Sequence, residues 1–208
     1  DVDTKDCTAL TDTELEEMAD ICTDGPARYG IGILSKQREE WVLVTRARNN
    51  GVLQGFSFST LERIGGTPCV LIGMASIKRT AKRGDVLKAL MLDELRRAVM
   101  AFPDEDVLVG TQTVDPSGYE AFQCALKLQD VTPRPGYSTT GEDRAWGRRL
   151  AKRFGVDAGY DDRAFRTKGD GSPACVLDHE SLKPEKLIPG LADLGVEERD
   201  RRVIRPLA

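Results

Sequence analysis

Histidine and cysteine are scarce in this chain, and their scarcity excludes several kinds of site. The 208 residues contain one histidine, His179, and five cysteines that lie far apart. Without a C-x-x-C pair, and with a single histidine, we expect no metal site, and a histidine-based catalytic triad is disfavoured. An odd number of scattered cysteines is typical of reduced thiols, so the sequence predicts a cytoplasmic protein.

Long hydrophobic runs and an excess of positive charge are also missing. No apolar run approaches the ~18–20 residues that span a bilayer, and DVDTKDCTAL has neither the basic start nor the apolar stretch of a secretory signal. The net charge of −4 provides no basic field for nucleic acid or anionic lipid. We therefore expect a soluble globular protein with neither nucleic acid nor a membrane as its partner.

The most informative stretch runs from Val70 to Met100. Its first part, Val70–Ile77, is almost entirely apolar or small, as in a strand that is covered on both faces. The next seven residues, KRTAKRG, carry four cations, and a helix is predicted over Asp85–Ala101 with Asp85 as its N-cap. A strand that leads through a basic loop to a helix N-terminus favours an anion site, most often for phosphate. The alternative is an ordinary solvated basic loop.

The rest of the first 130 residues predicts an α/β fold with a mixed sheet. A helix, an antiparallel meander and a strand–helix–strand crossover follow one another, and the crossover makes its two strands parallel. Asn49-Asn50-Gly51 and Gly65-Gly66 mark the turns of the meander. The predicted elements are a helix after the capping box Thr11–Glu14, a helix over Ser35–Glu40, strands over Trp41–Ala47, Val52–Thr60, Pro68–Ile77 and Val107–Val114, and a helix over Tyr119–Leu128.

The composition changes after Leu128, which predicts two regions. Residues 1–130 form the main domain, and residues 131–208 form a C-terminal extension that packs on it or completes it. Within the extension, a second capping box at Thr139–Glu142 precedes a helix over Glu142–Phe154, and a short strand is predicted at Ala174–Leu177. The charge-rich segment from about residue 197 is expected to be a flexible tail.

This order of elements resembles that of the GNAT acetyltransferase superfamily. The family signature places a Gln or Arg five residues after the last apolar residue of the fourth strand, and glycines eight and ten residues after it. With Ile77 as that apolar residue, Lys82 takes the Gln/Arg position, but Asp85 and Leu87 stand where the glycines should be. Gly84 is one residue too early, so the motif is degenerate.

The resemblance implies that acetyl-CoA, or another acyl-CoA, is a cosubstrate. In the family the strand backbone pairs with the pantetheine arm and stabilises the oxyanion, while the loop and the helix start hold the pyrophosphate. The matching positions are Met74, Ala75, Ser76, Ile77, Lys82, Arg83, Gly84, Asp85, Val86 and Leu87.

Acyl transfer to an amine needs a base for the nucleophile and an acid for the leaving thiolate. The catalytic Tyr of the family's late helix is missing, because Ala125 stands in its place. Tyr119 at the start of that helix is the candidate acid, and Glu62 and Asp115 are the candidate bases. A structural role for Tyr119, and ordered water as the base, are the alternatives.

The resemblance implies an N-acyltransferase, most simply an N-acetyltransferase, in which a small-molecule or peptide amine attacks the thioester directly. The alternative is a catalytically inactive GNAT-like interaction or regulatory module that could sense coenzyme A. A homodimer is compatible with the sequence.

Overall fold

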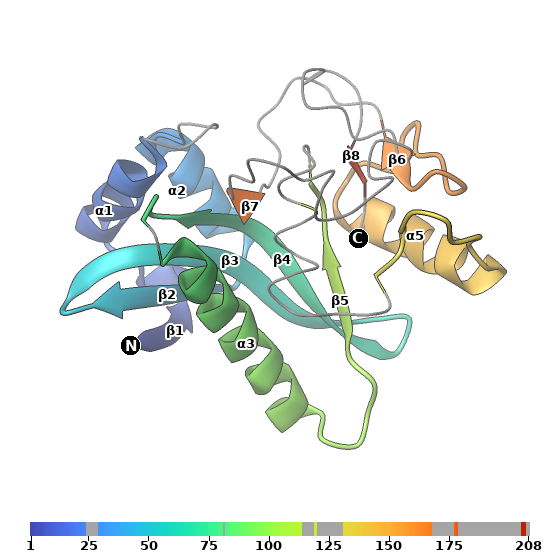
Figure 1. Cartoon of the computed structure of the whole chain (residues 1–208), viewed down its shortest axis with the longest axis horizontal. Helices are drawn as coiled ribbons and strands as arrows, with labels where there is room; N and C mark the ends of the chain where they lie inside the picture. The colour runs from blue at the N-terminus through green and yellow to red at the C-terminus, as the bar shows by residue number, and fades with distance from the viewer. Residues whose placement is uncertain are drawn as a thin grey trace. The chain divides into compact units, whose positions relative to one another are not determined.

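The computed structural model describes residues 1–23, 29–80, 82–113, 119, 131–167, 177–178 and 205–206. The chain divides into two compact units, Asp1–Val109 and Gly110–Ala208. The boundary near residue 130 stays a prediction. The elements (Figure 1) are β1 Val2–Asp6, a 3₁₀ turn at Cys7–Ala9, α1 Asp12–Cys22, α2 Ile31–Glu40, β2 Leu43–Asn49, β3 Val52–Ile64, β4 Thr67–Ile77, α3 Arg83–Ala101, β5 Leu108–Thr111, α5 Gly141–Arg153, β6 Arg166–Thr167, β7 Leu177–Asp178 and β8 Arg205–Pro206.

The main sheet has the predicted mixed α/β arrangement. Its strand order is β1-β2-β3-β4-β5; the first four strands are antiparallel neighbours, and β4 and β5 form a parallel pair joined through α3. The two predicted turns are present, with positive φ at Asn50 and Gly51 and at Gly65 and Gly66. Such φ values suit Asn and Gly, which explains why the chain reverses at these positions. The predicted fold class is confirmed.

Several element boundaries differ from the sequence prediction. The edge strand β1 was not predicted, and α2 begins at Ile31, four residues earlier than expected. The strand β3 continues to Ile64, because its last residues pair with the start of β4 across the Gly65-Gly66 turn. Apart from Tyr119, the helix predicted over Tyr119–Leu128 lies outside the described residues.

The two faces of the sheet carry different helices. Successive side chains of a strand point to opposite faces, so Thr45 and Arg46 on β2 point in opposite directions. Arg46 pairs with Glu14 of α1, whereas Thr45 shares a hydrogen bond with Thr4, which donates to Asp93 of α3. The helix α3 therefore covers one face, which Figure 1 shows as the green helix lying across the strands, and α1 covers the other.

Apolar side chains fill the space between the sheet and its helices. Phe56 and Phe58 on β3 meet edge to face, with ring centroids 5.8 Å apart, and Leu15 and Met18 are fully buried on α1. On α3 the buried residues recur at helical spacing: Leu87, Leu90, Met91, Glu94 and Ala98. Burial of each large apolar side chain stabilises the fold by about 2 kcal/mol. Glu94 is the exception in this row.

The described part of the second unit centres on α5. Thr140 and Asp143 form its capping box, one residue later than predicted, because Asp143 rather than Glu142 returns a hydrogen bond to the N-cap backbone. Tyr160 and Phe165 pack so closely against Gly147 that a Cβ there would lie 2.3 Å from the Tyr160 hydroxyl. The predicted tail lies outside the described residues, except for β8.

Three of the five cysteines, Cys7, Cys22 and Cys69, lie within the described residues, and all three are buried free thiols. This agrees with the predicted reduced state for these positions. Burial raises the pKa of Cys7 to about 12, so its thiolate is strongly disfavoured. The described helices include none that is long and apolar enough to cross a membrane.

Candidate functional site

The sequence places the candidate site where β4 ends and α3 begins, and the structure describes this corner except for residue 81. Met74, Ala75, Ser76 and Ile77 are all buried at the end of β4. The register between β3 and β4 shifts here, because Ser57 faces Ala75 whereas Ser59 faces Ile72. Two residues of β4 therefore lie opposite one residue of β3, which is a β-bulge.

A tryptophan packs directly on this bulge. Trp41, at the end of α2, is almost fully buried, and its indole nitrogen donates to Gln37 at 2.9 Å. A Cβ on Gly73 would lie only 2.3 Å from the Trp41 ring. Gly73 is therefore required by close approach, and the end of α2 holds the bulge in place.

The loop after β4 is organised by Thr80. The Thr80 amide donates to the Lys78 carbonyl at 2.8 Å, and its hydroxyl accepts from the Lys82 amide at 3.3 Å. The Thr80 carbonyl accepts from the Arg83 amide at 3.1 Å. One threonine therefore closes the turn between the strand and the helix through both its backbone and its side chain.

The start of α3 differs from the prediction. Lys82 is the N-cap, so Asp85 lies at the third helical position and is not the cap, and it is exposed. The amides of Asp85 and Val86 both donate to the Lys82 carbonyl, at 3.0 and 3.2 Å. Together with the Thr80 contacts, this means that the amides of residues 82, 83, 85 and 86 already have partners within the chain. A helix N-terminus ordinarily offers several free amides to an anion, but these four amides are already used here.

The positive charge of the loop is available to solvent at two positions. Lys78 and Lys82 are exposed and form no ion pair with any residue that the structure describes. Arg79 and Arg83 are half-buried and interact with the rest of the protein. Asp85 is the acidic residue in the first turn of the helix. Phosphate recognition here would depend on lysine side chains more than on backbone amides.

The remaining predicted cofactor positions have different surroundings. Gly84 is exposed, and a Cβ added there would meet nothing within 4 Å, so no close backbone approach explains this glycine. Val86 packs against Gly55 of β3, where a Cβ would lie 2.9 Å from its side chain. Leu87 is buried in the core under α3.

The three predicted catalytic residues are not brought together by the described structure. Tyr119 is fully buried and donates its hydroxyl to the Pro133 carbonyl; burial raises the pKa of Tyr119 to about 12. Glu62 is half-buried on β3, opposite Cys69 of β4. Asp115 lies outside the described residues. Their catalytic roles stay predictions, and the Pro133 contact gives Tyr119 a structural role.

Sequence reasoning missed Glu94 on α3, which is the most unusual ionisable group of the first unit. Only 4% of Glu94 is exposed, and neither carboxyl oxygen has a hydrogen-bond partner among the described residues. Burial raises the pKa of Glu94 to about 8, although nearby Ser57 and Ser59 lower it. The available signal was its position in the apolar row of α3, where a carboxylate interrupts the spacing. No group of three or more His, Cys, Asp or Glu residues within the described ranges could hold a metal ion.

Comparison with known proteins gives structural matches only. No family model matches the sequence, and no curated protein matches it. One similar solved structure is the ribosomal-protein-S18-alanine N-acetyltransferase from Escherichia coli, with 13% identity and a TM-score of 0.47, covering 68% of this chain and 86% of that chain. Another is an aminoglycoside acetyltransferase from an uncultured soil metagenomic sample, with 11% identity and a TM-score of 0.47, covering 67% and 95%. A third is a ribosomal-protein-alanine N-acetyltransferase from Brucella melitensis, with 14% identity and a TM-score of 0.45, covering 67% and 99%.

The order of the elements can be compared with the order expected from the sequence. An antiparallel meander leads into a buried strand, and α3 then crosses over to a parallel neighbour. This is the arrangement of elements that the resemblance to the GNAT superfamily implied, and the expected fold class is confirmed.

Proposed function

We propose that this protein is an N-acyltransferase that moves an acyl group, most simply acetyl, from coenzyme A to an amine. The observation that carries the proposal is the corner between β4 and α3, where a buried strand with a bulge leads into an exposed lysine pair beside a helix N-terminus. A strand end, a basic loop and a helix start in this order suit a diphosphate.

The described residues fit coenzyme A through side-chain charge. Lys78 and Lys82 would contact the phosphates as point charges, and Arg83 would add positive charge at the first helical position. Gly84 and Asp85 are exposed there, so the carboxylate of Asp85 has room to turn into solvent. Backbone amides at the start of α3 would contribute little to phosphate binding, because they already donate to oxygens of Thr80 and Lys82.

The acyl-CoA would supply the thioester, whose C–S bond breaks as the C–N bond to the amine forms. The β4 backbone from Met74 to Ile77 would orient the acyl group, and one of its amides would stabilise the developing oxyanion. Glu62 and Asp115 are the proposed bases for the amine, and Tyr119 is the proposed acid for the thiolate. The acceptor would be a small-molecule or peptide amine.

The test of this proposal begins with acetyl-CoA binding to the wild-type protein. At a concentration about 100 times its Kd, acetyl-CoA should stabilise the folded state by about 2.7 kcal/mol, seen as a rise in Tm. Replacing Lys78 and Lys82 together by Ala should weaken binding by about tenfold, measured by calorimetry.

The matched control is Lys88→Ala, which removes an exposed cation from α3 after its first turn. The Kd of this variant for acetyl-CoA should remain within about twofold of wild type. Lys88 follows Lys82 by six residues, about 9 Å along the helix, and salt screens charge over about this distance. Equal losses in both variants, or no binding by the wild type at millimolar acetyl-CoA, would contradict the phosphate role of the loop. Binding without thiol release in a screen of amines would indicate a sensor rather than an enzyme.

A further inference from the structure

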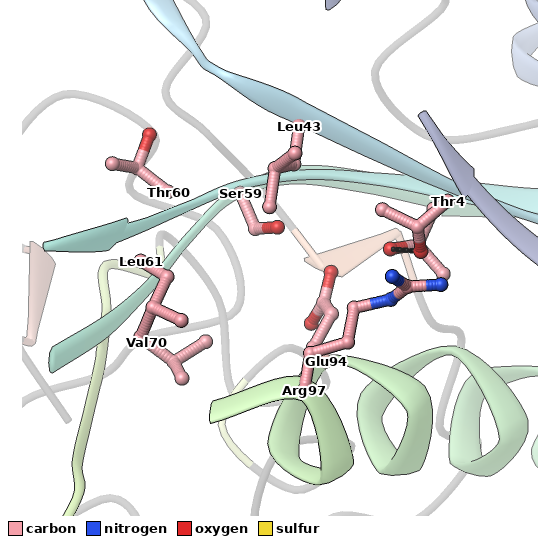
Figure 2. A pocket seen from close by; sticks show the side chains of 9 residues that line it. Thr4, Leu43, Ser59, Thr60, Leu61, Val70, Glu94 and Arg97 are labelled. Atoms are coloured by element: carbon pink, nitrogen blue, oxygen red, sulfur yellow. Dashed lines mark hydrogen bonds between the residues drawn. The ribbon is translucent and has the colours of Figure 1, made fainter. Parts of the chain in front are cut away.

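A small cavity lies between α3 and the sheet, away from the corner just described. Its volume is about 20 Å³, enough for about one water molecule. Figure 2 shows the carboxyl of Glu94 pointing from α3 toward the sheet, with the side chain of Arg97 extending beside it toward Thr4. The cavity is lined by Thr4, Leu43, Thr45, Ser59, Thr60, Leu61, Val70, Glu94 and Arg97.

The residues that the sheet contributes to the cavity lining carry either hydroxyl groups or apolar side chains. Thr4, Thr45 and Ser57 lie at matched positions on three neighbouring strands, so their side chains form a row on the face under α3. Thr4 and Thr45 share a hydrogen bond of 2.8 Å, whereas the Ser57 hydroxyl has no partner among the described residues. No strand contributes a charged side chain to the cavity lining.

The charged groups near Glu94 come from its own helix. Asp93 adds negative charge that raises the pKa of Glu94, and Arg97 lines the cavity. Further along the same face of β3, Arg63 is held by Glu105 at 2.6 Å. Among the residues that the structure describes, Arg97 is the cation that lines the cavity with Glu94, and it is paired with Asp93.

Arg97 lies within reach of two carboxyl groups, those of Asp93 and Glu94. Its Nε donates to Asp93 at 2.7 Å, and the same Asp93 oxygen accepts from Thr4 at 2.8 Å. Arg97 follows Asp93 by four residues and Glu94 by three, and both spacings place side chains next to each other on a helix. Either carboxyl group is within reach of the guanidinium after a change of rotamer.

We propose that Arg97 changes its carboxylate partner with the ionisation of Glu94, and that this exchange is a pH-sensitive switch in the packing of α3 on the sheet. When Glu94 is neutral, Arg97 pairs with Asp93 near the surface. When Glu94 is ionised, the buried charge needs a counterion, and the guanidinium turns from Asp93 toward the Glu94 carboxylate at the edge of the cavity to pair with it. Asp93 then keeps Thr4 as its donor. The inference does not depend on the proposed function.

The first experiment follows both groups in the wild-type protein by NMR between pH 5.5 and 9.5. The ¹³C shift of the Glu94 carboxyl reports its ionisation, and the ¹⁵N and ¹H shifts of Arg97 Nε–Hε report its partner. We expect both to move with the same midpoint. The Glu94→Gln variant, which cannot ionise, should abolish the Arg97 transition. An Arg97 signal that stays constant while Glu94 titrates in the wild-type protein would overturn the proposal. This outcome can be read from the wild type alone, whether or not the Glu94→Gln variant folds.

A second experiment separates the direct pair from the influence of Asp93. Asp93→Asn removes the competing carboxylate and leaves an amide oxygen for Thr4. In that background, Arg97→Gln should raise the Glu94 midpoint by about one pH unit or more, because a carboxylate beside a guanidinium is favoured by this amount. An unchanged midpoint would show that Arg97 never pairs with Glu94. Lys88→Gln in the same background serves as a charge-matched control and should leave the midpoint in place.

Discussion

The two faces of the first unit's sheet differ in whether their buried charged groups have partners of opposite charge. On the α1 face, Arg46 pairs with both Asp3 and Glu14, and Arg48 pairs with Glu17 at 2.6 Å. On the α3 face, Glu94 is more deeply buried and forms no ion pair with a described residue, and the effect of Ser57 and Ser59 on its pKa is smaller than that of burial. The comparison shows that burial alone does not fix the charge of a carboxyl group; the donors within reach decide it.

The pKa values of the two glutamates move apart accordingly. Burial alone would raise the pKa of Glu14, but hydrogen bonds from Lys5 and Thr11 outweigh it and lower the pKa to about 2. Glu14 therefore contributes stability above its ordinary pKa of 4.5, and this is lost as pH falls toward 2. Burial raises the pKa of Glu94 to about 8, so its contribution is present below pH 4.5 and is lost as pH rises toward 8.

The largest expected effect comes from breaking the paired face. Arg46→Met should lower the free energy of unfolding at pH 7 by about 3 kcal/mol, because the half-buried Glu14 and the exposed Asp3 lose the buried guanidinium that they share. Urea unfolding measures this loss. Arg63→Met, which removes the exposed partner of Glu105, should cost less than about 1 kcal/mol. Similar losses in the two variants would contradict the contrast between buried and exposed pairs.

The next prediction is an increase in the free energy of unfolding, and it tests Glu94 on the α3 face. Glu94→Gln should raise the free energy of unfolding by about 2 kcal/mol already at pH 6 and change it little at pH 4.5, because only the wild type must bury or neutralise a carboxylate as pH rises. Urea midpoints between pH 4.5 and 8.5 measure the difference. The exposed Glu105→Gln serves as the control and should show no such increase with pH. Parallel pH curves for wild type and Glu94→Gln would contradict the raised pKa.

The smallest effect concerns the hydroxyl row under α3. Ser57→Ala should change the free energy of unfolding by less than about 0.5 kcal/mol at pH 4.5, because its buried hydroxyl has no described partner. Thr4→Ala should cost about 1 kcal/mol or more, since Thr4 bonds to both Thr45 and Asp93. Thermal unfolding at fixed pH ranks the two variants, and the reverse order would contradict this account of the row.

Much of the fold could be predicted because local chemistry determined it. Thr11 and Glu14 form the predicted capping box, with both reciprocal hydrogen bonds present, and the hairpins turn where Asn and Gly allow positive φ. The edge strand β1 could not be predicted from its own residues, because VDTKD is mostly polar. It is held by long-range contacts, such as that of Asp3 with Arg46, which a local pattern does not contain.

The candidate site was less predictable for the same reason. A basic loop before a helix is visible in the sequence, but the use of its amides by Thr80 depends on the turn geometry. The position of Asp85 suggested an N-cap, yet the N-cap is Lys82, three residues earlier, because Lys82 supplies the first accepting carbonyl. In the sequence, Glu94 stood out only because it interrupts an apolar row of α3. That it has no counterion among the described residues of the sheet could not be predicted, because this depends on which strand residues lie opposite it.

The bulge in β4 also determines which changes of length the strand can accept. Ile72 and Ala75 face the same side of the sheet although they are three residues apart, and in a regular strand they would point to opposite sides. Deleting Gly73 would therefore restore strict alternation without reversing either half of the strand. It would draw Lys78 back toward the Gly65-Gly66 hairpin by about 3.3 Å. The basic loop can thus be shifted along the sheet by this one residue while the hydrophobic pattern on both sides is preserved.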